Sequence, residues 1–380
     1  MSYFSQAGES SLREYQTKSV LILGVGGIAM SQVALLLKSQ GFEVLGFDTV
    51  IYPPASDILC KAQIKILSNI GEITWQDIGF VVIGNSITRN HPTLPFVEAL
   101  RIPYCCMPKI IKDFLLDKSQ RIVVTGTHGK STTSALIVHF LTELGLSPSF
   151  MVGAVSRSGS SMLQQGVSDI AVVEGDEYDS SFYAKISKFY YYNPSVIVVT
   201  ALDYDHKDVF PTEESYIDNF RRFLLGLDNA TFIIHQKPLL KLGISTTDLK
   251  GSVIIYPSSD FSFRVCKQDR DALKIKTQLE LNIHQETYQL STNLIGSHNF
   301  ENILAASIAT YVATGKICSS LENFEGLKRR LELRAKSSRF ILIDDFAHHP
   351  SEVAAGLEAL KSNYQGWNLC VFFEPRSNTS

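Results

Sequence analysis

The stretch RIVVTGTHGKSTTSALIV, residues 121–138, decides the fold. An apolar run leads through a glycine-rich turn into a second apolar segment of helix length, which predicts a buried strand, a loop and a helix. In this arrangement the turn offers backbone N–H groups to phosphates, Lys130 adds a positive charge, and Ser131 or Thr132 supplies a hydroxyl for Mg²⁺. The loop is shorter than the standard P-loop pattern, which has glycine where Val124 stands. The stretch therefore predicts a nucleotide-binding unit.

Short apolar runs alternate with helix-length segments along most of the chain. Continuous apolar strands separated by helices indicate parallel sheets covered on both faces, which predicts an α/β fold with ligands at the carboxyl ends of the strands. Residues from about 230 to 295 instead alternate polar and apolar positions, as in GSVIIYPSSDFSFRV from residue 251, and predict a β-rich insertion of antiparallel strands. The predicted parallel strands are residues 20–23, 43–47, 81–83, 121–124, 170–173, 196–200, 339–343 and 369–373.

Composition narrows the class of protein. A chain of 380 residues with 45% hydrophobic and 19% charged residues predicts two or three packed domains. A net charge of -3 argues against nucleic acid as a partner. The uncharged run of residues 20–37 is interrupted by glycines, and no secretory signal precedes it, so no membrane segment is expected. Six cysteines without a metal-type pair indicate reduced thiols, and we expect a cytoplasmic protein.

GVGGIA, from Gly24 to Ala29, follows a predicted strand and opens a predicted helix. Its glycines, Gly26 and Gly27 included, allow a diphosphate to approach the helix N-terminus, and Asp48 at the end of the next strand can accept a bond from a ribose. The pattern does not distinguish NAD from a UDP-linked ligand. A tight strand–helix turn without any ligand is the plainer alternative.

Three further motifs follow predicted strands or open a helix. EGDEYD (174–179) places Glu174 at a strand end, where a carboxylate suits Mg²⁺, although acidic loops are most often simply solvated. DYDHKDVF places His206 at another strand end, as a ligand for a second divalent ion or as a structural histidine. In GSHNFEN, Asn299 and Asn302 share one helical face suited to a nucleobase or phosphate, or Asn299 caps the helix.

The last motifs lie near the carboxyl end of the sequence. LELR (331–334) precedes DDFAHHP (344–350), in which Asp345 follows a predicted strand and His348 and His349 lack a third metal ligand nearby in the sequence. FEPRSNT follows, and its Arg376 suits a bidentate contact with a carboxylate.

In their order along the chain, these motifs resemble the Mur ligases, the ATP-dependent amide-forming enzymes of peptidoglycan synthesis, from about Ser19 onward. IYPPASDIL, GNSITRNHP and FEPRSNT are similar to the murein peptide ligase branch of that family. This resemblance implies a peptidoglycan-recycling reaction that joins L-alanyl-γ-D-glutamyl-meso-diaminopimelate to UDP-N-acetylmuramate through an acyl phosphate. It also implies three domains: a Rossmann-like UDP-sugar domain (1–119), a central P-loop ATPase domain with the β-rich insertion (120–333) and the start of a Rossmann-like ligase domain (334–380).

The resemblance also assigns roles to residues, with Lys130, Glu174 and His206 as the catalytic group. The ATP-binding residues would be Gly126, Thr127, His128, Gly129, Lys130, Ser131, Thr132, Asn299, Asn302, Arg334 and Asp345. The UDP-sugar would contact Gly24, Gly26, Gly27, Asp48, Asn85 and Ser86. One Mg²⁺ would be held by Ser131 and Glu174 and a second by His206, while Arg376 and Asn378 would face the peptide.

Two departures from the family pattern and several alternatives stay open. The segment YIDNFRRF after His206 has no lysine where several Mur ligases carry a modified one, so other groups must complete a second metal site. The family pattern leads us to expect a third domain that continues past Ser380, so that this chain is truncated within it. Alternatives are a UDP-N-acetylmuramate–L-alanine ligase, a P-loop binding protein or inactive truncated ligase, and an NAD-dependent oxidoreductase. The sequence indicates neither the third residue of the peptide nor the oligomeric state.

Overall fold

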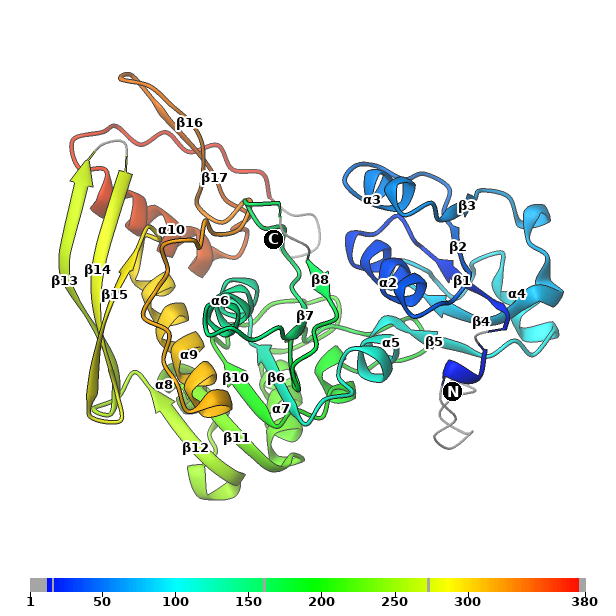
Figure 1. Ribbon diagram of the computed structural model, residues 1–380, viewed down its shortest axis with the longest axis horizontal. Coiled ribbons are helices and arrows are strands. Elements are labelled where there is room, and N and C mark those ends of the chain that lie inside the picture. The colour runs from blue at the N-terminus through cyan, green and yellow to red at the C-terminus, as the bar shows by residue number, and fades with distance from the viewer. Residues whose placement is uncertain (1–11, 16, 160–161, 272–273, 376–380) are drawn as a thin grey trace. The chain divides into compact units, whose positions relative to one another are not determined.

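The computed structural model describes residues 12–15, 17–159, 162–271 and 274–375, and these divide into two compact units (Figure 1). The first unit contains the described residues up to Asp117 together with 163–165 and 178–192. The second contains the rest of the described chain. Each unit has its own parallel sheet, which confirms the predicted α/β class.

The first unit is built on a five-stranded parallel sheet in the order β3-β2-β1-β4-β5. The central strands β1 and β4 are buried along their whole length, as expected for continuous apolar runs covered on both faces. This strand order matches five of the six strands of the doubly wound dinucleotide-binding fold. Its elements are β1 (Ser19–Leu23), α2 (Ile28–Ser39), β2 (Val44–Phe47), α3 (Ala55–Lys61), β3 (Lys65–Leu67), β4 (Ile78–Ile83), α4 (Leu94–Ala99), β5 (Tyr104–Cys106), α5 (Met107–Phe114) and β8 (Leu163–Gln164).

The second unit contains parallel strands in the order β12-β11-β10-β6-β9-β7. Helices α6 and α9 pack side by side over this sheet, because the small side chains of Ala305, Ala306 and Ala309 let α9 approach closely (Figure 1). The elements are β6 (Gln120–Thr125), α6 (Lys130–Glu143), β7 (Ser149–Met151), β9 (Ile170–Gly175), β10 (Val196–Val199), α7 (Glu213–Leu225), β11 (Asp228–His235), α8 (Gln236–Leu242), β12 (Lys250–Tyr256) and α9 (Ser297–Thr314).

The predicted β-rich insertion is present but begins later than expected. An antiparallel sheet is formed by β13 (Phe261–Asp271), β14 (Lys274–Ile283) and β15 (Glu286–Thr292). The expectation that GSVIIY also belongs to it is wrong, because these residues form β12, which pairs in parallel with β11. One face of the small sheet is covered by α9, where Leu279, Leu281 and Leu290 enter the same core as Ile303. The alternation of polar and apolar residues therefore has two causes. Strands β13 to β15 are half-buried, and β12 lies at the edge of its parallel sheet.

The carboxyl-terminal described residues form β16 (Glu332–Lys336), β17 (Ile341–Asp344) and α10 (Pro350–Asn363). The strand predicted at 339–343 is present as β17, but it pairs antiparallel with β16 instead of joining a parallel sheet. The strand predicted at 369–373 is not formed: among the described residues no strand pairs with this segment, and Phe372 is 92% exposed. Across the described chain, no helix combines the length and apolar character that a membrane span requires.

Candidate nucleotide site and its surroundings

Two glycines shape the loop between β6 and α6. Gly126 has a φ of +123° and Gly129 a φ of +81°, conformations that residues with side chains rarely adopt. A Cβ on Gly126 would lie 2.6 Å from the carbonyl oxygen of Ala201, and one on Gly129 would lie 2.5 Å from Oδ1 of Asn302. Glycine is therefore required at both positions. The loop leads directly into Lys130, the first residue of α6, where the free N–H groups of the helix favour anions.

Lys130 is bonded within its own loop. Its Nζ donates to the carbonyl oxygen of Gly126 (2.6 Å) and forms an ion pair with Oε2 of Glu177 (3.0 Å). Only 1% of the Glu177 side chain is exposed. Burial alone would lower the pKa of Lys130, but the carboxylates of Glu177 and Asp176 outweigh it and raise the pKa above its ordinary value. The ammonium is therefore held charged at the loop that is predicted to bind phosphates.

Ser131, in the first turn of α6, lies beside Glu174, near the carboxyl end of β9. Parallel pairing of β6 with β9 places Glu174 opposite Val124, so its side chain reaches the start of α6. The Ser131 hydroxyl donates to Oε2 of Glu174 (3.0 Å), and the backbone N–H of Gly153 donates to Oε1. Burial raises the pKa of Glu174, and nearby Asp176 adds to the effect. A hydroxyl beside a carboxylate is the oxygen donor set that Mg²⁺ prefers.

His206 lies beside the same acidic residues. Its backbone has a φ of +56°, and its Nε2 is 3.4 Å from Oε1 of Glu177 and 3.9 Å from Oδ2 of Asp205. Burial would lower the pKa of His206, but its contacts with Glu177 and Asp205 raise it overall. The carboxylate of Glu177 thus contacts both His206 and Lys130.

The two asparagines of GSHNFEN are buried near the start of α9. Because α9 begins at Ser297 with Gly296 as its N-cap, the alternative that Asn299 caps this helix is wrong. Asn299 Nδ2 donates to the carbonyl oxygen of Ile295 (2.8 Å). Oδ1 of Asn302 accepts a bond from the Thr133 hydroxyl (3.2 Å) and faces Gly129. Asn302 therefore supports the glycine loop from α9.

A cavity of about 260 Å³ opens beside the loop. Its walls include the predicted residues Asp345 and Thr132, but the arginine that lines it is Arg330. Arg334 lies on β16, where its guanidinium is 3.2 Å from Oε1 of Glu332 and its side chain is half-exposed. The lining residues that sequence analysis also selected are His128, Gly129, Ser131, Thr132, Asn299, Asn302 and Asp345.

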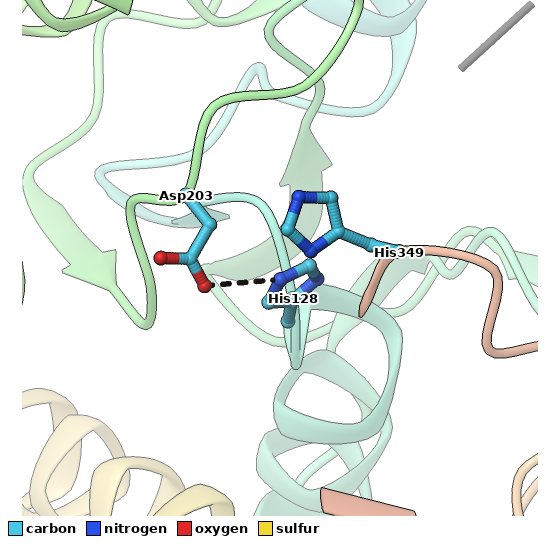
Figure 2. A group of neighbouring side chains, drawn as sticks. All are labelled: His128, Asp203 and His349. Carbon is cyan, nitrogen blue, oxygen red and sulfur yellow. Dashed lines mark ion pairs between the residues drawn. The ribbon is translucent and has the colours of Figure 1, made fainter. Parts of the chain in front are cut away.

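His128 and Thr127 tie the loop to other segments. The Thr127 hydroxyl donates to the carbonyl oxygen of Asp203 (2.7 Å), and the backbone N–H of Asp203 donates back to it (2.8 Å). Nε2 of His128 is 3.2 Å from Oδ2 of Asp203 (Figure 2). Its Nδ1 is 3.2 Å from Oε1 of Glu352 on α10. Burial would lower the pKa of His128, but hydrogen bonds to the two carboxylates raise it.

In the first unit, the predicted UDP-sugar residues meet at the carboxyl ends of β1, β2 and β4. The backbone N–H of Gly26 donates to Oδ2 of Asp48 (2.9 Å), and Oδ1 of Asp48 accepts from the N–H of Thr49 (2.9 Å). Gly24 has a φ of +75°, and a Cβ there would lie 3.0 Å from Oγ of Ser86. The Asp48 side chain therefore stabilises the glycine turn through its bond from the N–H of Gly26. Gly27 is the N-cap of α2, and Asn85 lies beside Ser86 in the exposed turn after β4.

The predicted peptide-facing residues, Arg376 and Asn378, lie outside the described residues. Their roles stay predictions.

Two protein families match successive parts of the chain. Residues 19–118 match the family described as Mur ligase family, catalytic domain, and residues 124–310 match the Mur ligase middle domain. A UDP-N-acetylmuramate–L-alanyl-γ-D-glutamyl-meso-2,6-diaminoheptandioate ligase of Escherichia coli is 32% identical over 370 residues, covering 94% of this chain and 79% of the relative. The chain belongs to the Mur ligase family. The Haemophilus influenzae ligase of the same name is 30% identical over 371 residues, covering 95% of this chain and 80% of that protein.

This Mur ligase also resembles a solved structure across its length. The crystal structure of a murein peptide ligase from Psychrobacter arcticus aligns with a TM-score of 0.74 at 25% identity, covering 95% of this chain and 79% of that one. The likeness confirms the predicted α/β architecture.

Three residues of the site in this Mur ligase could not be found from the sequence: Glu177, Arg330 and Glu352. Glu177 belongs to EGDEYD, but its position two residues past the end of β9 gave Glu174 precedence. Arg330 precedes the LELR motif by one residue, and Glu352 lies in the first turn of α10. Each reaches the loop only through tertiary contacts, and the acidic cluster was the only sequence signal for any of them.

Proposed function

We propose that this Mur ligase uses ATP to join murein tripeptide, L-alanyl-γ-D-glutamyl-meso-diaminopimelate, to UDP-N-acetylmuramate. Mur ligases are ATP-dependent ligases that form a bond between a carboxylate and an amine. The observation that carries the choice of substrates is the likeness, at 30–32% identity over nearly the whole chain, to two ligases whose names state these substrates.

The loop around Lys130 is the proposed phosphate site. Its ammonium is buried, charged and 2.6 Å from a loop carbonyl oxygen, so it can turn from that oxygen to a phosphate oxygen without leaving the loop. The cavity beside Gly129 and Asn302 is the proposed nucleoside site, and Asp345 and Arg330 also line it. Arg334 would require a change of side-chain position to join them, because it is paired with Glu332.

Ser131 and Glu174 fit a Mg²⁺ ion. Their hydroxyl and carboxylate oxygens are 3.0 Å apart, and Glu174 is held with a raised pKa that a divalent cation would lower. His206 is proposed for a second ion, and Glu177 and Asp205 are the carboxylates near enough to complete its shell in the absence of a lysine. When bound, such cations neutralise phosphate charge during transfer.

The proposed reaction has two steps. The carboxylate of the muramate lactyl group attacks the γ-phosphate of ATP and forms an acyl phosphate, and ADP leaves. The amine of the peptide then attacks the acyl carbon, and phosphate leaves. Two anions must meet in the first step, so the charge of Lys130 lowers its barrier, while the loop holds the phosphates in place. In the first unit, the turn of Gly24 and Gly26 with Asp48 is the proposed UDP-sugar site.

Phosphate release tests the proposed substrates. The protein is supplied with ATP, Mg²⁺ and UDP-N-acetylmuramate, and either tripeptide or L-alanine is added as the amine. We expect phosphate release and a product of the summed mass with tripeptide only. Release with L-alanine and not with tripeptide would assign the protein to the alanine ligases instead. In a parallel assay with NAD added, a change in NAD absorbance without phosphate release would assign an oxidoreductase.

The Lys130→Ala variant tests the phosphate site. We expect its rate to fall by about 100-fold or more, the usual cost of removing one group that stabilises charge in a transition state. Lys237→Ala is the matched control, because Lys237 lines the same cavity from α8 and has no proposed contact with phosphates. Full activity in Lys130→Ala would refute the proposed role.

A further inference from the structure

The histidine pair of DDFAHHP acquires partners in the folded chain. His349, the N-cap residue of α10, lies against His128 from the P-loop and Asp203 from the loop after β10 (Figure 2). The two imidazole rings have centroids 4.8 Å apart. One nitrogen or oxygen atom of each of the three side chains lies within 4.8 Å of the others. Side chains separated by as many as 221 residues in the sequence therefore form one cluster.

The outer nitrogen of each histidine is already bonded. Nε2 of His349 is 3.2 Å from the carbonyl oxygen of Tyr204, which can only accept, so Nε2 carries the hydrogen and Nδ1 keeps a lone pair. Nδ1 of His128 is 3.2 Å from Oε1 of Glu352, so the neutral ring has its hydrogen on Nδ1 and its lone pair on Nε2, whereas the protonated ring donates to Asp203 as well. A hydrogen bond from the outer nitrogen to a carbonyl or carboxylate is the arrangement that orients histidines which bind metals.

Asp203 is oriented in the same way. Its Oδ1 accepts a bond from Nζ of Lys241 (2.9 Å), and its Oδ2 is directed at Nε2 of His128, 3.2 Å away. The contacts of Asp203 with His128 and Lys241 hold the pKa of its carboxyl well below the usual range, so it is ionised. Two imidazole nitrogens and one carboxylate oxygen thus face a common point.

The hydroxyl of Ser351 lies at that point and cannot satisfy all three atoms. Its Oγ is 2.6 Å from Nε2 of His128, 2.7 Å from Nδ1 of His349 and 3.0 Å from Oδ2 of Asp203. The backbone N–H of Ser351 also points at Nδ1 of His349 (3.3 Å). The Ser351 N–H thus serves Nδ1 of His349, while the Ser351 hydroxyl and a proton on Nε2 of His128 are the hydrogens that reach Oδ2 of Asp203. A metal ion bound to the same three side chains would take the place of that proton.

We propose that His128, Asp203 and His349 form a binding site for Zn²⁺, separate from the Mg²⁺ site of Ser131 and Glu174. Two imidazoles and one carboxylate are ligands that Zn²⁺ accepts, whereas Mg²⁺ prefers oxygen alone. The Ser351 hydroxyl lies where the ion would be held, so it has to rotate away when the ion binds, and water takes the fourth position. Zinc–ligand bonds of about 2.0 Å place tetrahedral ligands about 3.3 Å apart, a spacing that His128 and Asp203 already have.

Such an ion would connect parts of the fold that meet at the nucleotide cavity. His128 belongs to the loop and His349 starts α10, and both His128 and Asp203 line the cavity wall. Bound Zn²⁺ would fix the first turn of α10 against the loop. Because the metal replaces the proton on His128, it is expected to bind more tightly as the pH rises.

Metal titration of the full chain tests the proposal. Chelator-treated protein is titrated with Zn²⁺ by calorimetry and with Co²⁺ by visible absorbance, and we expect one site with a low-coordinate Co²⁺ spectrum. Loss of even an outer partner of a metal ligand weakens binding about 10–100-fold, so His349→Asn should weaken it by about 100-fold or more. Asparagine can still cap α10, which keeps the variant folded.

His284→Asn is the matched control, because His284 is an exposed histidine on the turn between β14 and β15. Its backbone has a positive φ, a conformation that asparagine tolerates. We expect it to bind like the wild type. The exposed cysteines offer a competing site, and thiolate ligation would give Co²⁺ an intense charge-transfer band in the near ultraviolet. The proposal is overturned if no Zn²⁺ binds, if His349→Asn binds like His284→Asn, or if the bound Co²⁺ shows thiolate bands.

Discussion

Replacing Glu177 by glutamine should destabilise the second unit far more than an ordinary loss of an ion pair. Lys130 and Glu177 are 3.0 Å apart, with side chains 14% and 1% exposed. Removing one partner of a buried pair leaves a buried charge without compensation and typically costs about 3–5 kcal/mol. Glutamine keeps the shape and one acceptor oxygen, so we expect the lower end, about 3 kcal/mol. For a domain of this size, about 3 kcal/mol lowers Tm by roughly 6–12 °C.

Scanning calorimetry measures this shift, and the transition of the second unit is the one that ATP with Mg²⁺ raises. Asp228→Asn is the control, because Asp228 and Lys250 form a pair of similar length, 2.8 Å, in which both side chains are mostly exposed. Such surface pairs contribute about 0–1 kcal/mol. If Glu177→Gln lowers Tm no more than Asp228→Asn does, the buried ion pair does not stabilise the loop, and the reasoning is refuted.

Two other perturbations follow from the loop. Gly129→Ala should destabilise the protein by at least about 1 kcal/mol more than Gly145→Ala. Both glycines have a φ near +80°, but only at Gly129 would a Cβ meet another atom, Oδ1 of Asn302. If urea unfolding shows equal losses in the free energy of unfolding for the two variants, the close approach is contradicted. His128 has a raised pKa in the folded protein, so its stabilisation is complete below its ordinary value of about 6.5 and is lost as the pH rises through the folded pKa. With chelator present, the free energy of unfolding should therefore fall more between about pH 6 and pH 9 in the wild type than in His128→Gln, and parallel pH profiles would contradict this.

The sequence was sufficient to predict the residues whose positions follow from local rules. Lys130 and Ser131 stand at the first turn of a helix after a glycine loop, and Glu174 stands at a strand end, so each could be placed from its own segment. Parallel pairing then brought them together, as α/β sheets do. Asp48 and Gly26 were found by the same reasoning.

The remainder depended on contacts that no local pattern encodes. Glu352 meets His128 across more than 200 residues, and nothing in the helix pattern of α10 indicates which of its faces meets the loop. His349 had no further ligands nearby in the sequence because its neighbours in the cluster, His128 and Asp203, come from distant segments, and the adjacent His348 does not belong to the cluster. Strand 369–373 was predicted from its apolar residues alone, but a strand also needs a neighbour to share its backbone hydrogen bonds.

The hydrogen bonds of Lys130 within its own loop have a consequence for inhibitor discovery. A compound with an anionic group must draw the ammonium away from the Gly126 carbonyl oxygen and so sacrifice a bond that the resting loop already has. A neutral compound that fills the neighbouring cavity leaves that bond intact and avoids the exchange. Screening by displacement of a phosphate-containing probe would therefore favour the first kind of compound and overlook the second. A fragment screen that reports on the cavity walls near Tyr256 and His298 would recover both.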